Sequence, residues 1–204
     1  MIRPFDPERD AEGVVDLIHE AFPASTATVE SWLHQEASIP ARAKHAGWVA
    51  VVDGVVAGRA EATLKWWSAS GAAFVGITVR SAFRRRGIGS ALWEVGEQHL
   101  AAIGSTRVTT MFIETPEGVG FAQARGFEEE RGEVLAWVDP ATVAATPPDE
   151  ACRVVPLSDV PAEEVYEVDL ITTEDVPMTD AVDQMPYDEW LDTTLRSTAK
   201  RGAE

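Results

Sequence analysis

The spacing of hydrophobic residues predicts alternating strands and helices along the first two thirds of the chain. A short apolar run at residues 2–5 is typical of a strand. Hydrophobic residues then recur three or four positions apart between residues 14 and 22, which is the spacing of one face of an amphipathic helix. Asp6 followed by Pro7 is typical of a helix start, because aspartate caps the first turn and proline fits its first position. A second helix is predicted over residues 28–37.

The middle of the chain favours strands before and after a third helix. Residues 47–64 hold two β-rich runs that meet at Asp53-Gly54, a dipeptide typical of a hairpin turn. Residues 73–79 predict a further strand, and apolar residues spaced three or four apart predict a helix over 88–103 that Gly104 ends. The remaining predictions are a strand over 106–114, a short helix over 118–125 and two short strands within 127–139.

The composition of the sequence changes after residue 140. Residues 141–151, ATVAATPPDEA, are small, contain prolines and show no periodicity, as in a linker. Within residues 152–204, the tripeptide Glu189-Trp190-Leu191 echoes Ser31-Trp32-Leu33. We therefore expect one domain over residues 1–140 and a partial repeat over 152–204, consisting of the first strand and helices of a second unit. Because half a domain buries its own apolar face poorly, we expect this segment to dock on residues 1–140 or to form a homodimer.

Charge excludes some classes of partner. The formal net charge is −17. Residues 1–150 contribute −8 and residues 151–204 contribute −9, so the last quarter is the most acidic part. Such a surface repels nucleic acid and anionic lipid. The sequence contains no apolar run long enough to span a membrane, and its first ten residues, MIRPFDPERD, do not resemble a secretory signal.

The content of cysteine and histidine bounds the location and the metal chemistry. Cys152 is the single cysteine, so we expect a reducing, cytoplasmic environment and no disulfide within the chain. The four histidines show no paired spacing typical of metal ligands, and no metal site is predicted.

One basic stretch, VRSAFRRRGIGSALW at 79–93, stands out in this acidic chain. A strand, then glycines, then a helix is an arrangement that binds phosphate, because the first helical amides lack partners within the helix. The P-loop pattern requires Lys followed by Ser or Thr, but Gly89 is followed by Ser90-Ala91. The dinucleotide fingerprint requires a third glycine where Leu92 stands. The alternative is a solvated arginine run before a glycine turn.

The stretch resembles the pyrophosphate loop of the GNAT acetyltransferase superfamily, V-x-x-x-[FY]-R-x-[RK]-G-x-G-x-x-L. The matching residues are Val79, Phe83, Arg84, Arg86, Gly87, Gly89 and Leu92. The order of elements over 1–139 and the segment FAQARGF at 121–127 extend the resemblance. It implies an α/β (α+β) GNAT fold, with a mixed, mostly antiparallel sheet of six to seven strands flanked by helices. The whole chain resembles the first domain of a tandem GNAT protein followed by the start of a second.

The resemblance also implies a cofactor and the residues that hold it. An N-acetyltransferase of this family moves an acetyl group from acetyl-CoA to the amine of a small-molecule acceptor. The backbone of Ile77 and Val79 is expected to pair with the pantetheine arm, and Thr115 falls where the family often has an asparagine that helps hold the cofactor. The pyrophosphate is expected at the amides of Arg85, Arg86, Gly87, Ile88, Gly89 and Ser90, beside Arg84.

The usual acid and base of the family are missing. Ala122 stands where the family has a tyrosine acid, and Ala73 stands where it often has a glutamate base. Two carboxylates are substitutes. Glu61 lies in the second hairpin strand beside the expected cleft, and its alternative is an outward, solvated strand carboxylate. Glu114 ends the strand after the phosphate helix, and its alternative is a carboxylate at the start of the next helix.

Two functions remain open at this point. The first is acetyl transfer, in which Trp66 and Trp67 line an acceptor pocket for an apolar or aromatic amine; alternatively, they cover the end of the sheet or meet a partner. The second is an acyl-CoA-binding or sensing module that has lost catalysis. His99, on the phosphate helix, is expected to be packed or to face solvent.

Overall fold

The computed structural model describes residues 1–68, 70–134, 136–143, 153–176 and 183–195. A five-stranded sheet forms the centre, with the strands in chain order across it. Its strands are β1 (Ile2–Pro4), β2 (Ala46–Val52), β3 (Val55–Leu64), β4 (Ala72–Val79) and β5 (Arg107–Thr109). Neighbouring strands are antiparallel except β4 and β5, which are parallel. The mixed, mostly antiparallel sheet is therefore confirmed.

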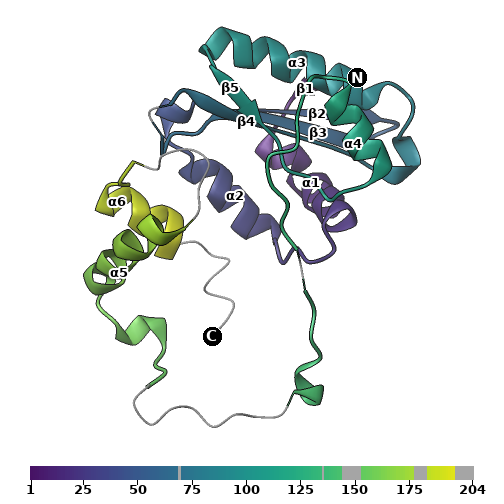
Figure 1. Cartoon of the computed structure of the whole chain (residues 1–204). Helices are drawn as coiled ribbons and strands as arrows, with labels where there is room; N and C mark the ends of the chain where they lie inside the picture. Colours follow the sequence, from purple (N-terminus) through teal and green to yellow (C-terminus); the bar gives the residue numbers. More distant parts are fainter. Residues whose placement is uncertain (69, 135, 144–152, 177–182, 196–204) are drawn as a thin grey trace.

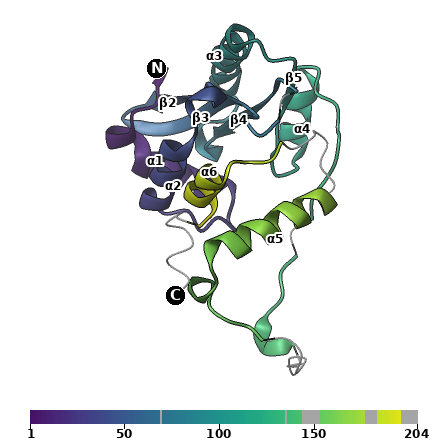
Figure 2. The same ribbon diagram turned by 90° about the vertical axis from the view of Figure 1, so that its left-hand side faces the viewer.

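Helices cover both faces of the sheet (Figure 1, Figure 2). The helices of this part of the chain are α1 (Pro7–Ala21), α2 (Val29–Ser38), α3 (Ile88–Ile103) and α4 (Pro116–Gln123). Helix α3 lies on one face, α1 and α2 lie on the other, and α4 follows β5. As the sequence predicts, the Asp6 side chain accepts a hydrogen bond from the Glu8 amide at the start of α1. Among the described residues, no helix has both the length and the apolar character needed to cross a membrane.

The alternation of side chains along the central strands sets what each face contains. Ala60 and Ala62 of β3 point toward α3, where Leu92 and Leu100 are buried against the sheet. The residues between them, with odd numbers, point toward α2. Small alanine side chains let α3 approach this face closely, while the opposite face of β3 carries charged residues described below.

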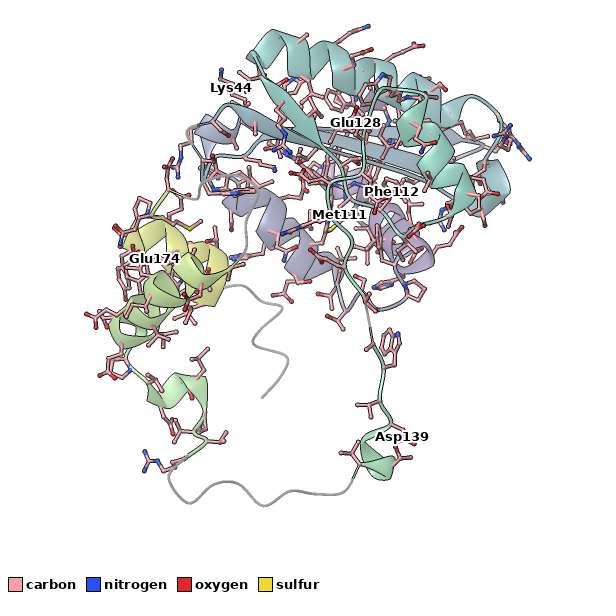
Figure 3. All side chains as sticks on the ribbon, viewed as in Figure 1. Lys44, Met111, Phe112, Glu128, Asp139 and Glu174 are labelled. Carbon is pink, nitrogen blue, oxygen red and sulfur yellow. The ribbon has the colours of Figure 1, made fainter. Side chains whose placement is uncertain are left out.

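Residues 127–139 depart from the prediction. The two short strands expected within 127–139 are not seen in the described residues of that segment, so a sheet of six to seven strands is not confirmed. Phe127 packs against Trp93, but the next four residues, 128–131, are all charged. A half-buried strand needs apolar residues at alternate positions, and this run supplies them to neither face. Beyond β5, Met111 and Phe112 are exposed (Figure 3).

The described residues after 152 form helices. Residues 162–175 form α5, residues 187–190 form α6, and a single wider turn continues to residue 195. The strand expected at the start of a second unit is absent from the described residues 153–156, because these residues make no strand pairing. Trp190 of α6 is buried against Tyr166 and Tyr187. The helices agree with the predicted partial repeat, but the repeat itself is not confirmed.

A buried ion pair joins the first strand to the first helix. Both terminal nitrogens of Arg3 donate to Asp10, at 2.6 Å each, and the amide of Asp6 donates to the same carboxylate at 2.9 Å. Asp10 is only 2% exposed. The hydrogen bonds from the Arg3 guanidinium hold the pKa of Asp10 below its ordinary value. The charged form of Asp10 therefore stabilises the folded state.

We expect Asp10→Asn to lower the free energy of unfolding at pH 7 by about 3 kcal/mol, because it leaves Arg3 without its buried partner. Because the folded pKa is depressed, the contribution of Asp10 is complete above its unfolded pKa and is lost as the pH falls below about 4. The two proteins should therefore converge in acid. Urea unfolding at several pH values measures this, with Asp16→Asn, an exposed site on the same helix, as the control. A constant difference down to pH 2 would contradict it.

Candidate active site

Strands β4 and β5 part from each other, and this leaves one edge of β4 open. They pair only between Ala72–Phe74 and Arg107–Thr109. In contrast, β4 pairs with β3 along its whole length, up to Val79 opposite Gly58. Within the described residues, the second half of β4 therefore has a strand on one side only. A strand edge of this kind offers backbone donors and acceptors to a ligand.

The direction of the backbone groups shows which residues face the open edge. The carbonyl of Ala72 accepts from the Lys65 amide, and the amide of Arg80 donates to the Ala57 carbonyl, so both point toward the β3 side. Because backbone groups alternate between the two edges of a strand, Ile77 and Val79 point the other way. The predicted cofactor-binding backbone of these two residues thus faces the open edge. The Val79 carbonyl already accepts from Arg84 Nε at 3.1 Å.

The loop between β4 and α3 presents backbone amides to solvent. Arg85 has φ of 61° and Gly87 has φ of 82°, both in the left-handed region. The helix then begins at Ile88 without a side-chain cap and without an acidic residue in its first turn. Its first amides are therefore available, and the helix dipole favours an anion there. Gly89 is needed for space, because a Cβ atom there would lie 3.2 Å from the Phe121 ring.

Arg125 adds a positive charge that the sequence analysis did not single out. Its guanidinium donates to Ser90 Oγ at 3.0 Å and to the Phe121 carbonyl at 2.9 Å, and it lies over the Phe121 ring. Burial lowers the pKa of Arg125, and its Nε is a buried donor without a partner in the described residues. The only sequence signal for Arg125 is its place next to Gly126 in the segment 121–127, which resembles a family element.

Glu61 lies over the middle of β4. It stands opposite Gly76 in the register of β3 and β4, on the face toward α2. A Cβ atom at Gly76 would be 2.9 Å from Glu61 Oε1, so the carboxylate covers the space that glycine leaves free. The carboxylate is partly buried rather than outward and solvated, and it lies where β4 has just lost its β5 partner.

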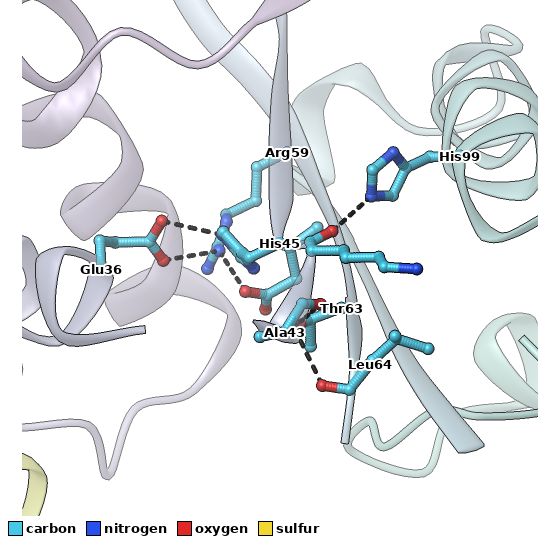
Figure 4. A network of polar contacts seen from close by, with 9 residues as sticks. Glu36, Ala43, His45, Arg59, Thr63, Leu64 and His99 are labelled. Atoms are coloured by element: carbon cyan, nitrogen blue, oxygen red, sulfur yellow. Dashed lines mark hydrogen bonds and ion pairs between the residues drawn. The ribbon is translucent and has the colours of Figure 1, made fainter. Parts of the chain in front are cut away.

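Glu61 belongs to a network of charged side chains between α2 and the sheet. Figure 4 shows Glu36, His45 and Arg59 of this network. Arg59 Nη2 is 2.8 Å from Glu61 Oε2 and 3.7 Å from Glu36 Oε1. His45 Nε2 is 3.1 Å from Glu36 Oε2, and its Nδ1 is buried without a partner in the described residues. Sequence analysis missed Glu36 and His45, because their approach depends on how α2 packs on the sheet and leaves no local pattern.

The same network has the side chains of a metal site but not its charge balance. One ligand atom from each of Glu36, His45 and Glu61 lies within 4.8 Å of the others. However, Arg59 pairs with both carboxylates, so a cation is already present in the network. The arrangement is therefore a network of ion pairs in which Arg59 lies between the two carboxylates.

The other predicted residues lie elsewhere. Glu114 is exposed in the coil before α4, and Thr115 is the N-cap of α4, where its Oγ1 accepts from the Gly118 amide at 3.1 Å. Ala122 and Ala73 are buried, and an alanine side chain can act neither as an acid nor as a base. His99 is packed, as expected: it contacts Trp48 and bonds to the carbonyl of Lys44.

Known structures share this fold. An apo aminoglycoside antibiotic 6'-N-acetyltransferase from Acinetobacter haemolyticus is 18% identical, with a TM-score of 0.52, over 68% of this chain and 98% of that one. AAC(6')-Iy with the bisubstrate analogue CoA-S-monomethyl-acetylneamine is 23% identical, with a TM-score of 0.51, over 68% and 97%. Glucosamine-6-phosphate N-acetyltransferase from Arabidopsis thaliana is 17% identical, with a TM-score of 0.52, over 68% and 98%. No curated protein matches the chain significantly.

The family model of the acetyltransferase (GNAT) family matches residues 11–138, which is more than half of the chain. The match includes the open edge of β4, the glycine loop and the start of α3. Together with the fold, this match shows that the protein belongs to the acetyltransferase (GNAT) family.

Proposed function

We propose that the protein transfers an acetyl group from acetyl-CoA to the amine of a small-molecule acceptor. The observation that supports this best is the position of Glu61, whose carboxylate lies over Gly76 on the α2-facing side of β4, the strand whose other edge is open to a cofactor. A carboxylate there is within reach of an amine that approaches from the α2 side. The net charge of −17 attracts cationic amines and disfavours nucleic acid.

The residues present fit acetyl-CoA, which supplies an acyl thioester when bound. The backbone of Ile77 and Val79 would pair with its pantetheine arm. The amides of residues 85–90 would hold its pyrophosphate, with the charge of Arg125 beside Ser90. We assign no contact to the Thr115 side chain beyond its role as helix cap, although its hydroxyl hydrogen remains able to donate.

We assign Glu61 the role of general base. The acceptor ammonium must lose a proton before its nitrogen can attack, and a positioned carboxylate can accept that proton. Arg59 holds Oε2 of Glu61, which leaves Oε1, the oxygen over Gly76, for the amine. Arg59 and His45 act through Glu61 and Glu36 as positioning residues. A thiolate is a good leaving group, so the buried Ala122 in place of an acid does not prevent the reaction.

Ala122 and Ala73 also favour a second candidate, an acyl-CoA-binding module without catalysis. Such a module keeps the loop before α3 and releases no CoA with any amine. The two candidates differ in turnover and not in cofactor affinity.

We also propose the division of the chain into a GNAT domain over 1–140, a linker over 141–151 and an incomplete second GNAT-like unit over 152–204. Two consecutive helices, α5 and α6, follow residue 152, as α1 and α2 follow β1 at the start of the chain, and this supports the division. The linker itself lies outside the described residues, apart from 141–143. A homodimer through the C-terminal segment stays a prediction.

The glycine loop allows a test of the cofactor site. Gly87→Val places a β-branched residue in the left-handed region, which costs about 1–2 kcal/mol locally and redirects the loop amides. We expect the Kd for CoA, measured by calorimetry, to rise by about tenfold or more. Gly104→Val is the matched control, because Gly104 also has positive φ and open space but ends α3 at the far side. Equal CoA affinity in the two variants would refute the assignment of the pyrophosphate to this loop.

The two candidate carboxylates allow a test of catalysis. With an amine that supports CoA release, we expect Glu61→Gln to lower kcat by about 100-fold or more, because the base is removed, and to leave the affinity for CoA unchanged. Glu114→Gln should keep wild-type kcat, since Glu114 is exposed in the coil before α4. Thiol detection of released CoA measures both. A normal kcat in Glu61→Gln would remove Glu61 from the mechanism, and CoA binding without release across a broad amine panel would favour the binding module.

A further inference from the structure

A small cavity lies where the C-terminal segment meets the loop between β3 and β4. Its volume is about 200 Å³. The first domain supplies Arg42, Trp66 and Trp67 to its lining, and the C-terminal segment supplies residues 183–186. Figure 1 shows α6 beside this end of the sheet. The cavity is thus built from two parts of the chain that are more than 100 residues apart in sequence.

Two contacts hold the walls together. The amide of Asp183 donates to the Trp67 carbonyl at 2.6 Å, and Arg42 pairs with Glu189 at 2.6 Å. The rings of Trp66 and Trp67 meet edge to face, with centroids 4.6 Å apart. The C-terminal segment is therefore fixed on both sides of the cavity.

The polar groups of the cavity are not all satisfied. Trp66 Nε1 is buried and has no hydrogen-bond partner within the described residues. Asp183 is exposed, and no partner of its carboxylate is found among the same residues. Since Glu189 neutralises Arg42, the carboxylate of Asp183 is the uncompensated charge of the lining. Two indole rings beside a carboxylate suit an ammonium group, through cation–π attraction and charge pairing. The Trp66 Nε1 donor takes no part in this, because an ammonium group offers it no acceptor.

The distance to Glu61 defines what kind of molecule can use both sites. Three more residues of β3 follow Glu61, and Trp66 lies in the turn just after the strand. A strand rises about 3.3 Å per residue, so the two lie on the order of 10–15 Å apart. On the other wall, Glu36 lies near the end of α2, and Arg42 of the cavity lies six residues later in the chain. A ligand with one end at Glu61 and the other at this cavity must be elongated.

We propose that this cavity binds the distal ammonium group of an elongated acceptor with two or more amines, while its reacting amine lies at Glu61. This rests on the proposed acetyl transfer. The C-terminal segment then determines acceptor choice through Asp183, and the first domain supplies the cofactor site. The net charge of −9 in residues 151–204 adds a field that attracts such a polycation.

A series of linear α,ω-diamines tests this with the full chain, from butane-1,4-diamine to dodecane-1,12-diamine, each compared with the monoamine of equal length. We expect KM in the CoA-release assay to fall by about tenfold between the short and the long diamines, since one cation–π contact and one ion pair are gained. The monoamines should show no such fall. Asp183→Asn should abolish the length dependence, so that short and long diamines have similar KM values. Asp188→Asn, an exposed site in the same segment, is the matched control.

A direct binding measurement separates this inference from the proposed function. Tryptophan fluorescence is titrated with dodecane-1,12-diamine in the presence of CoA, with wild type and with Asp183→Asn. Tighter binding to wild type by about tenfold supports the cavity even if no CoA is released, in which case only the proposed function fails. Equal binding by the two proteins, or CoA release with the same length dependence in both, overturns the inference.

Discussion

The separation of β4 from β5 is the constraint on which the site depends. Two parallel strands that stayed paired would use every backbone group of β4 within the sheet. Because pairing stops after Phe74, Ile77 and Val79 keep groups directed away from β3, and the same strand leads straight into the glycine loop before α3. The early end of the β4–β5 pairing thus places an open backbone edge next to the N-terminus of α3. A long, anionic ligand can contact both.

Local patterns predicted the elements that carry this arrangement. Helix periodicity and capping residues predicted α1, α2 and α3 to within a few residues, because these signals depend on neighbours in the sequence. The motif from Val79 to Leu92 predicted the loop for the same reason. The strands expected within 127–139 are not seen among the described residues of that segment, since the four charged residues 128–131 supply no apolar side chains to either face of a strand.

The chemistry of the site was less accessible from the sequence. Glu61 was ambiguous between the cleft and solvent, because a shift of one residue in the β3–β4 register would move it to the other face. The observed register places Glu61 opposite Gly76, and this register depends on the whole hairpin. Glu36 and His45 meet Arg59 only through tertiary packing. The tail residue Asp183 reaches the Trp67 loop through a contact that no periodicity encodes.

The bond from Arg84 to the Val79 carbonyl has a consequence for how tightly this edge can bind a ligand. A ligand amide that reaches this carbonyl meets an acceptor already in use and must share its second lone pair or replace the guanidinium. Exchange of one donor for another adds little free energy, since the bonds before and after are similar. The Val79 carbonyl therefore adds little net free energy to the binding of such a ligand.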